Sequence, residues 1–342
     1  MEILHRLKLR KIKKLLAHKS QNIVIVSHRN PDGDAMGSSV ALYNFLGKLG
    51  HKVNIVVPNA YPQFLGWMKG VGETLVFEKN KDKCVEVFRN CTILFTLDFN
   101  DLSRVREFAE YLLPVNCYKV LIDHHPEPGS FADFSVSDTS VSSTSELVYL
   151  FMKAVSKENI DKDIAEAVYV GIMTDTGCFS FNSSKKQTFD VVGELLQKNI
   201  DKDKVFGLVY NNYSIDRMRL LGHCLGNRMV YLPEFRSAYI WLTQDDIKRF
   251  NFKVGDSEGF VNLPLSVKGV VFSAFFTERE DIVKISLRSK GNFAVNSIAQ
   301  RFYQGGGHPN AAGGESKVKL TETIETFVNI LKEYKQELLD AE

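Results

Sequence analysis

Aspartate and histidine side chains follow directly after short apolar runs in the first half of this chain, and this arrangement constrains the fold most. The clusters are His28-Arg29-Asn30-Pro31-Asp32-Gly33-Asp34 after Asn22–Ser27, Asp98 after 92–97, and Asp123-His124-His125 after 119–122. In an open parallel sheet the carboxyl ends of the strands meet at one edge, and ligands bind there. We therefore expect a parallel sheet that brings these side chains to one edge.

The acids of these clusters, together with one further aspartate, carry more negative charge than a single pocket can hold. They are Asp32, Asp34, Asp98 and Asp175. Ionised carboxylates placed a few ångström apart raise one another's pKa. Two divalent cations would cancel the charge, and the histidines would complete the ligand shells. The pattern predicts a hydrolase in which two metal ions activate a water molecule and stabilise charge on a phosphate.

The hydrophobic pattern predicts an α/β fold with two domains. The runs in the first half are apolar throughout, which is typical of parallel strands that helices cover on both faces. Predicted helices lie at 35–49, 81–89 and 102–113, and mainly helical sequence follows from 141 to 228. Strands return at 230–232, 238–242, 269–277 and 282–287, before an amphipathic helix at 321–339. We predict a doubly wound, mainly parallel domain at 1–195, a helical linker at 196–228 and a smaller α/β domain at 229–342.

Composition excludes several other classes of protein. A chain of 342 residues is too long for one comfortable core. Its net charge of +2 argues against a broad surface for non-specific binding of nucleic acid. The five cysteines show no CxxC spacing and are expected to be reduced thiols. The basic N-terminal stretch lacks the apolar core of a signal peptide, and no run reaches the roughly 20 apolar residues of a membrane span. We expect a cytoplasmic protein without a membrane anchor.

The first cluster suits a divalent metal ion. His28, Asp32 and Asp34 lie between a strand and a helix, where Pro31 and Gly33 allow a tight turn. Carboxylates combined with imidazole fit manganese, whereas magnesium prefers shells made of oxygen alone. The same residues by themselves could form a plain turn with an aspartate N-cap. The other clusters favour the metal site.

The remaining candidates in the first half each have a simpler alternative. Asp98 could cap a helix, although its place beside the first cluster makes it the natural bridging carboxylate. Asp123 could orient a histidine, as metal-bound imidazoles usually require. His124 would then bind metal, and His125 would contact phosphate or donate a proton. Asp175 lies in a Thr-Asp-Thr-Gly loop that often marks only a turn.

Two segments of the second half could bind an anion. Gly305, Gly306 and Gly307 could surround it with backbone N–H groups, with His308 alongside, or they could form a flexible turn. Arg288 could clamp a phosphate or simply be solvated. The run at 142–145 (Ser-Ser-Thr-Ser) is expected to cap the helix that follows it.

Three motifs in order give a specific resemblance. HRNPDGDAMGS, DHH and GGGHPNAAGG resemble the DHH–DHHA1 phosphoesterase superfamily, from about residue 21 to 341. The two-domain form is similar to the NrnA-like branch of oligoribonucleases (nano-RNases) and 3′-phosphoadenosine 5′-phosphate (pAp) phosphatases. This resemblance implies a manganese-dependent enzyme with two metal ions. Its catalytic domain would face a substrate-binding domain across an active-site cleft.

The resemblance also implies a role for each matching residue. His28 and Asp32 would hold one metal ion, Asp34, His124 and Asp175 the other, and Asp98 would bridge them. His125 would lie near the scissile phosphate with Asp123 as its supporting acid. Arg288 and the segment Gly305, Gly306, Gly307 and His308 would bind substrate. Tyr303-Gln304 departs from the family pattern, where relatives often carry more glycine.

The predicted activities are 3′–5′ trimming of RNA oligonucleotides of roughly two to five residues and conversion of pAp to AMP and phosphate. A cyclic or linear dinucleotide phosphodiesterase is an alternative, although such relatives usually carry membrane and sensory segments that this sequence lacks. An exopolyphosphatase or pyrophosphatase would share the metal set but use a second domain rich in lysine and arginine. Intact ligands argue against a non-catalytic nucleotide sensor. A homodimer through the first domain or the bridging helices fits this organisation.

Overall fold

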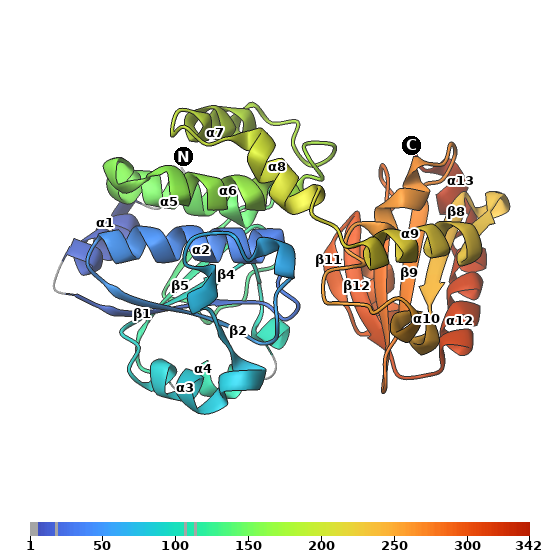
Figure 1. Ribbon diagram of the computed structural model, residues 1–342, viewed down its shortest axis with the longest axis horizontal. Coiled ribbons are helices and arrows are strands. Elements are labelled where there is room, and N and C mark those ends of the chain that lie inside the picture. The colour runs from blue at the N-terminus through green and yellow to red at the C-terminus, as the bar shows by residue number, and fades with distance from the viewer. Residues whose placement is uncertain (1–5, 18–19, 106–107, 113–114) are drawn as a thin grey trace. The chain divides into compact units, whose positions relative to one another are not determined.

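A computed structural model describes residues 6–17, 20–105, 108–112 and 115–342. The chain divides into two compact units, Met1–Asn212 and Tyr213–Glu342, whose elements are labelled in Figure 1. The division falls inside the segment 196–228. Helix α8 (Lys202–Tyr210) belongs to the first unit and α9 (Ile215–Asn227) to the second. We describe each unit by itself.

The first unit contains a parallel sheet, as the sequence predicts, and the sheet has six strands in the order β3-β2-β1-β4-β5-β6. Its strands are β1 (Asn22–Ser27), β2 (Lys52–Val57), β3 (Leu75–Val76), β4 (Ile93–Leu97), β5 (Tyr118–Asp123) and β6 (Phe134–Ser137). Because the strands are parallel, their carboxyl ends share one edge. The short edge strands β3 and β6 were not predicted, since runs of two and four residues give little periodic signal.

Helices cover both faces of this sheet, which explains why its strands are apolar throughout. Ile23 and Ile25 of β1 enter a core with α2 (Gly33–Lys48), α5 (Thr144–Ser156) and α6 (Lys162–Asp175). The alternate residues Val24 and Val26 enter a second core with α3 (Phe77–Arg89) and α4 (Ala109–Leu112). Figure 1 shows these two helical layers on opposite sides of the sheet. The layers are completed by α1 (Arg6–Ala17) and α7 (Lys186–Leu196).

Glycine allows an unusually close contact between α2 and α6. A Cβ atom added at Gly37 of α2 would lie 2.6 Å from the carbonyl oxygen of Ala167 on α6. A Cβ atom added at Gly171 of α6 would lie 1.8 Å from Oγ of Ser145 and 2.7 Å from Oδ1 of Asp34. The backbones could not approach this closely with any larger residue. This packing therefore fixes the start of α2 against α5 and α6.

The second unit is a smaller α/β domain, as predicted. Its mixed six-stranded sheet has the order β11-β12-β10-β9-β8-β7, and only the β8–β9 pair is parallel. The strands are β7 (Met229–Leu232), β8 (Ser237–Leu242), β9 (Phe272–Glu278), β10 (Val283–Ser289), β11 (Gly306–His308) and β12 (Ala311–Ser316). The helices that accompany α9 are α10 (Gln244–Arg249), α11 (Val295–Tyr303), α12 (Leu320–Glu333) and α13 (Lys335–Asp340).

Several element boundaries differ from the sequence prediction. Strand β9 begins only at Phe272, because Gly269 adopts a left-handed turn with φ +88°. The C-terminal helix is interrupted at Tyr334, which separates α12 from α13. In place of the predicted helix 102–113 there are a 3-10 turn, Leu102–Val105, and α4, while residues 106–107 and 113 lie outside the described part. No helix among the described residues is long and apolar enough to cross a membrane.

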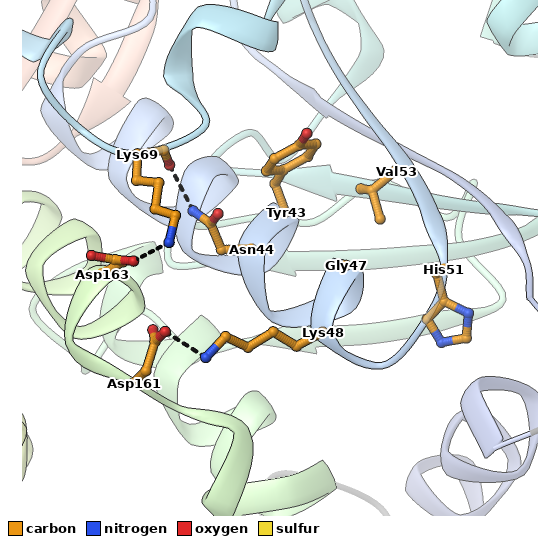
Figure 2. A pocket seen from close by; sticks show the side chains of 9 residues that line it. All are labelled: Tyr43, Asn44, Gly47, Lys48, His51, Val53, Lys69, Asp161 and Asp163. Atoms are coloured by element: carbon orange, nitrogen blue, oxygen red, sulfur yellow. Dashed lines mark hydrogen bonds and ion pairs between the residues drawn. The ribbon is translucent and has the colours of Figure 1, made fainter.

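A pocket of about 300 Å³ lies around the carboxyl end of α2 (Figure 2). Its lysines are paired with acids at the start of α6: Lys48 contacts Asp161, and Nζ of Lys69 lies 2.5 Å from Oδ2 of Asp163. A Cβ atom added at Gly47, which also lines this pocket, would meet no other atom within 4 Å. Gly37 and Gly47, both in α2, thus occupy opposite kinds of environment.

This difference makes the helix contact testable. We expect Gly37→Ala to lower the free energy of unfolding by about 1–3 kcal/mol, because the new methyl group meets backbone atoms that cannot move aside. Gly47→Ala should raise it by up to about 1 kcal/mol, because alanine loses less backbone entropy in a helix. Urea denaturation of the two variants measures both changes. Equal effects would contradict a glycine-dependent contact between α2 and α6.

Candidate metal centre

The sheet edge and the ends of two helices bring the predicted ligands together in the first unit. His28, Asp98 and the pair His124-His125 follow β1, β4 and β5, which are neighbours in the sheet. Asp123 is the last residue of β5. Asp32 is the N-cap of α2, Asp34 lies in its first turn, and Asp175 is the last residue of α6.

Asp98 lies at the centre of this cluster. Its backbone is left-handed, with φ +64°, directly where the chain leaves β4. Its Oδ2 lies 3.4 Å from Nε2 of His28. Its Oδ1 lies 3.7 Å from Nε2 of His124 and 3.7 Å from Nδ1 of His125. One buried carboxylate therefore faces three imidazole rings.

Three groups of possible metal ligands share Asp98; one consists of Asp98, Asp123 and His125, and the other two contain further predicted ligands near it. In the first of these two, one atom each of His28, Asp32 and Asp98 lies within 4.8 Å of the others, and in the second the same holds for Asp34, Asp98 and His124. Asp175 adjoins the second group, with its Oδ2 atom 3.5 Å from Nε2 of His124. This arrangement has the form of two adjacent metal sites with a common carboxylate.

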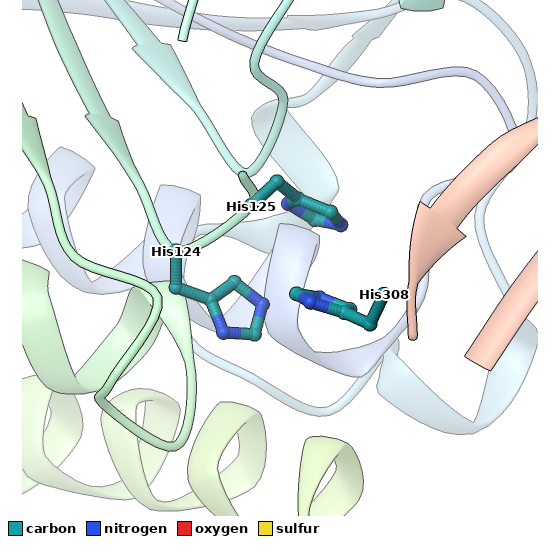
Figure 3. Close-up of side chains that lie close together, drawn as sticks. All are labelled: His124, His125 and His308. Carbon is teal, nitrogen blue, oxygen red and sulfur yellow. The ribbon is translucent and has the colours of Figure 1, made fainter. Parts of the chain in front are cut away.

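His125 is oriented by a different acid. Its Nδ1 atom lies 2.8 Å from Oδ1 of Asp123, which is fully buried. An ionised carboxylate only accepts hydrogen bonds, so Nδ1 carries the proton and Nε2 is left for other contacts. Figure 3 shows His125 beside His124 at the end of β5, with ring centroids 4.9 Å apart. His308, also drawn there, belongs to β11 of the second unit.

The segment 142–145 holds two of the central carboxylates. The Thr144 hydroxyl donates to Oδ1 of Asp98 at 2.9 Å. The backbone N–H groups of Thr144 and Ser145 donate to the two oxygens of Asp34 at 2.7 and 2.8 Å. Ser143 is the N-cap of α5, as predicted, but the contacts with Asp34 and Asp98 were missed. The run of hydroxyl residues was their only signal, because the partners lie far away in the sequence.

A buried glutamate supports this segment in turn. Glu146 is fully buried, and its Oε2 atom accepts hydrogen bonds from the backbone N–H and the hydroxyl of Ser142, at 3.2 and 2.7 Å, and from Thr188 at 2.9 Å. Its Oε1 atom accepts from Gln187 at 2.8 Å. Donors on every side compensate the burial of the charge. The network ties the start of α5 to α7 and keeps the segment 142–145 in place.

The surroundings shift the pKa values of the clustered carboxylates in different directions. Burial, followed by repulsion from Asp34 and Asp32, raises the pKa of Asp98 well above its usual value. Burial also raises the pKa of Asp34. For Asp32, burial is outweighed by His28 and the amide of Ala35, so the pKa is lowered. Full ionisation of the cluster thus requires added positive charge.

The pKa values of the histidines are also shifted in different directions. Burial would lower the pKa of His124, but Asp175, Asp98 and Asp34 outweigh it and raise the value to about 9. Burial, then the neighbouring His124, lowers the pKa of His125 far below its usual value. Burial also lowers the pKa of His28. Crowded carboxylates beside imidazoles at these spacings fit a pair of divalent cations as the missing charge.

The predicted anion-binding residues lie on one face of the second sheet. Arg288 of β10 and His308 of β11 both pair with Ala311 of β12, from its two sides. Leu287 and Ala312, one step along, are buried in the core of this unit, so Arg288 and His308 occupy the opposite face. Arg288 and His308 thus lie on the same face of the sheet and on either side of Ala311 in the intervening strand β12.

The glycines beside His308 form a strand and not the flexible turn considered as an alternative. Gly306 and Gly307 pair with Gly313 and Ala312 of β12. A Cβ atom added at Gly305 would lie 1.9 Å from the carbonyl oxygen of Gly313, and Gly307 has φ +140°. Close approach of β11 to β12 therefore requires glycine, independently of any ligand.

Comparisons with known proteins agree with both units. The model of the DHH family, N-terminal domain, matches residues 22–172, and that of the DHHA1 domain matches 238–337. The bifunctional oligoribonuclease and PAP phosphatase NrnA of Thermus thermophilus is 30% identical, over 98% of this chain and 95% of its own. NrnA of Bacillus subtilis is 28% identical, over 85% and 88%. The crystal structure of an exopolyphosphatase-related protein from Bacteroides fragilis superposes with a TM-score of 0.93 at 40% identity, covering 99% of this chain and 100% of that one.

The crowded negative charge around Asp98 predicts that this residue lowers the stability of the metal-free protein and raises the stability of the metal-bound protein. Without metal, Asp98→Asn should raise the free energy of unfolding by about 1 kcal/mol or more, because it removes a repelled, buried charge. With manganese the wild type should be the more stable of the two proteins, since it gains more free energy of unfolding from bound cations. Thermal unfolding in chelator and in manganese measures both states. Asp203→Asn, at a side chain that is 86% exposed, is the control and should change neither. A destabilised Asp98→Asn without metal would contradict the interpretation.

Proposed function

Because the chain belongs to the DHH family of phosphoesterases with a DHHA1 domain, we propose that it hydrolyses short oligoribonucleotides and converts pAp to AMP and phosphate. The observation that carries this proposal is that the group of His28 and Asp32 and the group of Asp34 and His124 both include Asp98. The similarity to two NrnA enzymes over most of the chain supports the substrate class. Cleavage from the 3′ end, a cytoplasmic location and a homodimer stay predictions.

The proposed ligands follow the two groups. His28 and Asp32 would hold one ion, Asp34, His124 and Asp175 the other, and Asp98 both. A mixed set of carboxylates and imidazoles favours manganese over magnesium. When bound, the ions would supply an activated water and compensate the charge that develops on the phosphate.

The protein's own residues would position the reacting groups. Asp123 fixes the ring of His125, whose Nε2 atom would contact the scissile phosphate. Thr144 and Ser145 hold Asp98 and Asp34 through the three hydrogen bonds described above, so the ligand oxygens need little rearrangement when cations bind. This preorganisation supports a hydrolytic site more than a simple cation store.

The second unit would hold the other end of the substrate. Arg288 and the segment Gly305–His308 would form a small anion site, with the arginine suited to a terminal phosphate. The net charge of only +2 favours oligonucleotides of roughly two to five residues over long RNA. Polyphosphate is a second candidate substrate, because the Bacteroides fragilis relative is described as exopolyphosphatase-related.

A substrate panel tests the proposal. We expect a dinucleotide and pAp to be hydrolysed fastest, a pentanucleotide more slowly, and cyclic di-AMP, pyrophosphate and polyphosphate least, each faster with manganese than with magnesium. Asp98→Asn should reduce hydrolysis of the dinucleotide about 100-fold or more, because both ions lose a ligand. Asp203→Asn should leave the rate unchanged. If Asp98→Asn retained the wild-type rate with manganese, the bridging role would be wrong, and faster hydrolysis of polyphosphate would favour the second candidate.

Arg288 provides a separate test of the second unit. Arg288→Ala should lower kcat/KM for the dinucleotide and pAp by about 10- to 100-fold, the usual effect of losing a hydrogen bond to a charged group. Lys284→Ala is the matched control, because Lys284 lies on the same strand and the same sheet face, four residues away. Steady-state kinetics on both substrates measures the effects. No change in affinity or rate with Arg288→Ala would show that the substrate site is misassigned.

A further inference from the structure

An exposed aromatic side chain lies in the loop directly after the metal centre. Phe181, between α6 and α7, is 48% exposed. Phe179, two residues earlier, instead packs against the core, with its ring 6.1 Å from Tyr169 and 5.8 Å from Phe189. Of the two phenylalanines that follow Asp175, Phe179 therefore anchors the loop, and Phe181 is presented on its surface.

The loop that carries Phe181 is tightly held in a costly conformation. Gly177, Cys178 and Phe179 all have left-handed backbones, with φ +53°, +57° and +65°. Residues with a side chain strongly disfavour this conformation. Thr176 compensates with three contacts: its hydroxyl oxygen accepts from the amide of Phe179 at 3.0 Å, and its carbonyl oxygen accepts from those of Ser180 and Phe181 at 2.9 and 3.1 Å. Backbone strain that the surroundings maintain in this way is concentrated at functional sites.

Contacts on both sides tie this loop to the metal centre. The ring of Phe181 lies against Gly177, where an added Cβ atom would be 2.3 Å from Cε1 of the ring. Gly177 is only two residues from Asp175. On the other side, the Asn182 side chain donates to the carbonyl oxygen of Ser142 at 3.3 Å, at the start of the segment 142–145 that holds Asp34 and Asp98. The loop that carries the exposed ring is thus joined on both sides to segments that carry or hold the predicted ligands.

We propose that the Phe181 ring is a stacking platform for a nucleobase of the substrate, next to the phosphate at the metal centre. This inference rests on the proposed function and specifies its substrate class. Single-stranded nucleic acid is commonly held by bases stacked on aromatic side chains, and such stacking tolerates any base because each has a π-face. A platform of this kind favours nucleotides over pyrophosphate or polyphosphate, which have no base to stack.

Removing the ring tests the platform. We expect Phe181→Ala to lower kcat/KM for diadenylate by roughly 5- to 100-fold, the range for a lost base–aromatic contact. Two analogues of diadenylate, each lacking one of its two bases, identify the base that stacks. The loss of kcat/KM with Phe181→Ala should persist on the analogue that keeps the stacked base and fall below twofold on the analogue that lacks it. Phe181→Trp should retain activity on diadenylate. Phe189→Ala is the matched control, since Phe189 is 52% exposed on the neighbouring helix α7, and it should show no dependence on the base.

The outcomes separate this inference from the proposed function. Equal losses with Phe181→Ala on diadenylate and on both analogues would overturn the platform, as would the same base dependence in Phe189→Ala. In either case the wild type would still hydrolyse diadenylate, and the proposed function would stand. If the wild type with manganese hydrolysed neither diadenylate nor pAp, the proposed function would fail and the platform with it. A loss that depends on one base supports both.

Discussion

The repulsion among buried carboxylates around Asp98 is the constraint on which the first unit depends. Asp34 and Asp98 are 1% and 2% exposed, so water cannot screen their charge. The fold compensates part of it with hydrogen bonds from Thr144 and Ser145 and with the amino ends of α2 and α5, which carry partial positive charge. The raised pKa of Asp98 shows that this compensation is incomplete. The uncompensated part is the driving force available for cation binding.

The same contacts that pack the helices also determine the geometry of the proposed metal ligands. Gly171 of α6 lies against both Asp34 and Ser145, so the distance between α2 and α6 and the position of one carboxylate depend on a single glycine. Asp175 lies one turn further along α6. A change in helix packing would therefore displace ligands from two elements together. The stability of this core and the geometry of the proposed metal centre therefore depend on the same contacts.

Sequence alone predicted the elements that carry the ligands, because strand ends in a parallel sheet follow from a simple rule. Short apolar runs locate β1, β4 and β5, and the polar residues after them must meet at one edge. The contact between Thr144 and Asp98 joins residues 46 positions apart and leaves no local pattern. The close approach at Gly37 is equally hidden, since an isolated glycine in a helix has no periodic signature. Strand β11 was missed because its glycines resemble a turn.

The position of the basic residues limits how the protein could hold RNA. The exposed side chains of Arg10, Lys11, Lys13 and Lys14 form a basic face on α1. Lys11 lies 4.5 Å from the ring centre of Tyr118, the first residue of β5. This helix therefore borders the amino ends of the strands, whereas Asp98 lies at their carboxyl ends. A long RNA gains affinity from a continuous row of phosphate contacts. Because the basic face of α1 is at the opposite edge of the sheet, it cannot extend such a row from the proposed metal centre, which favours substrates held by their own ends.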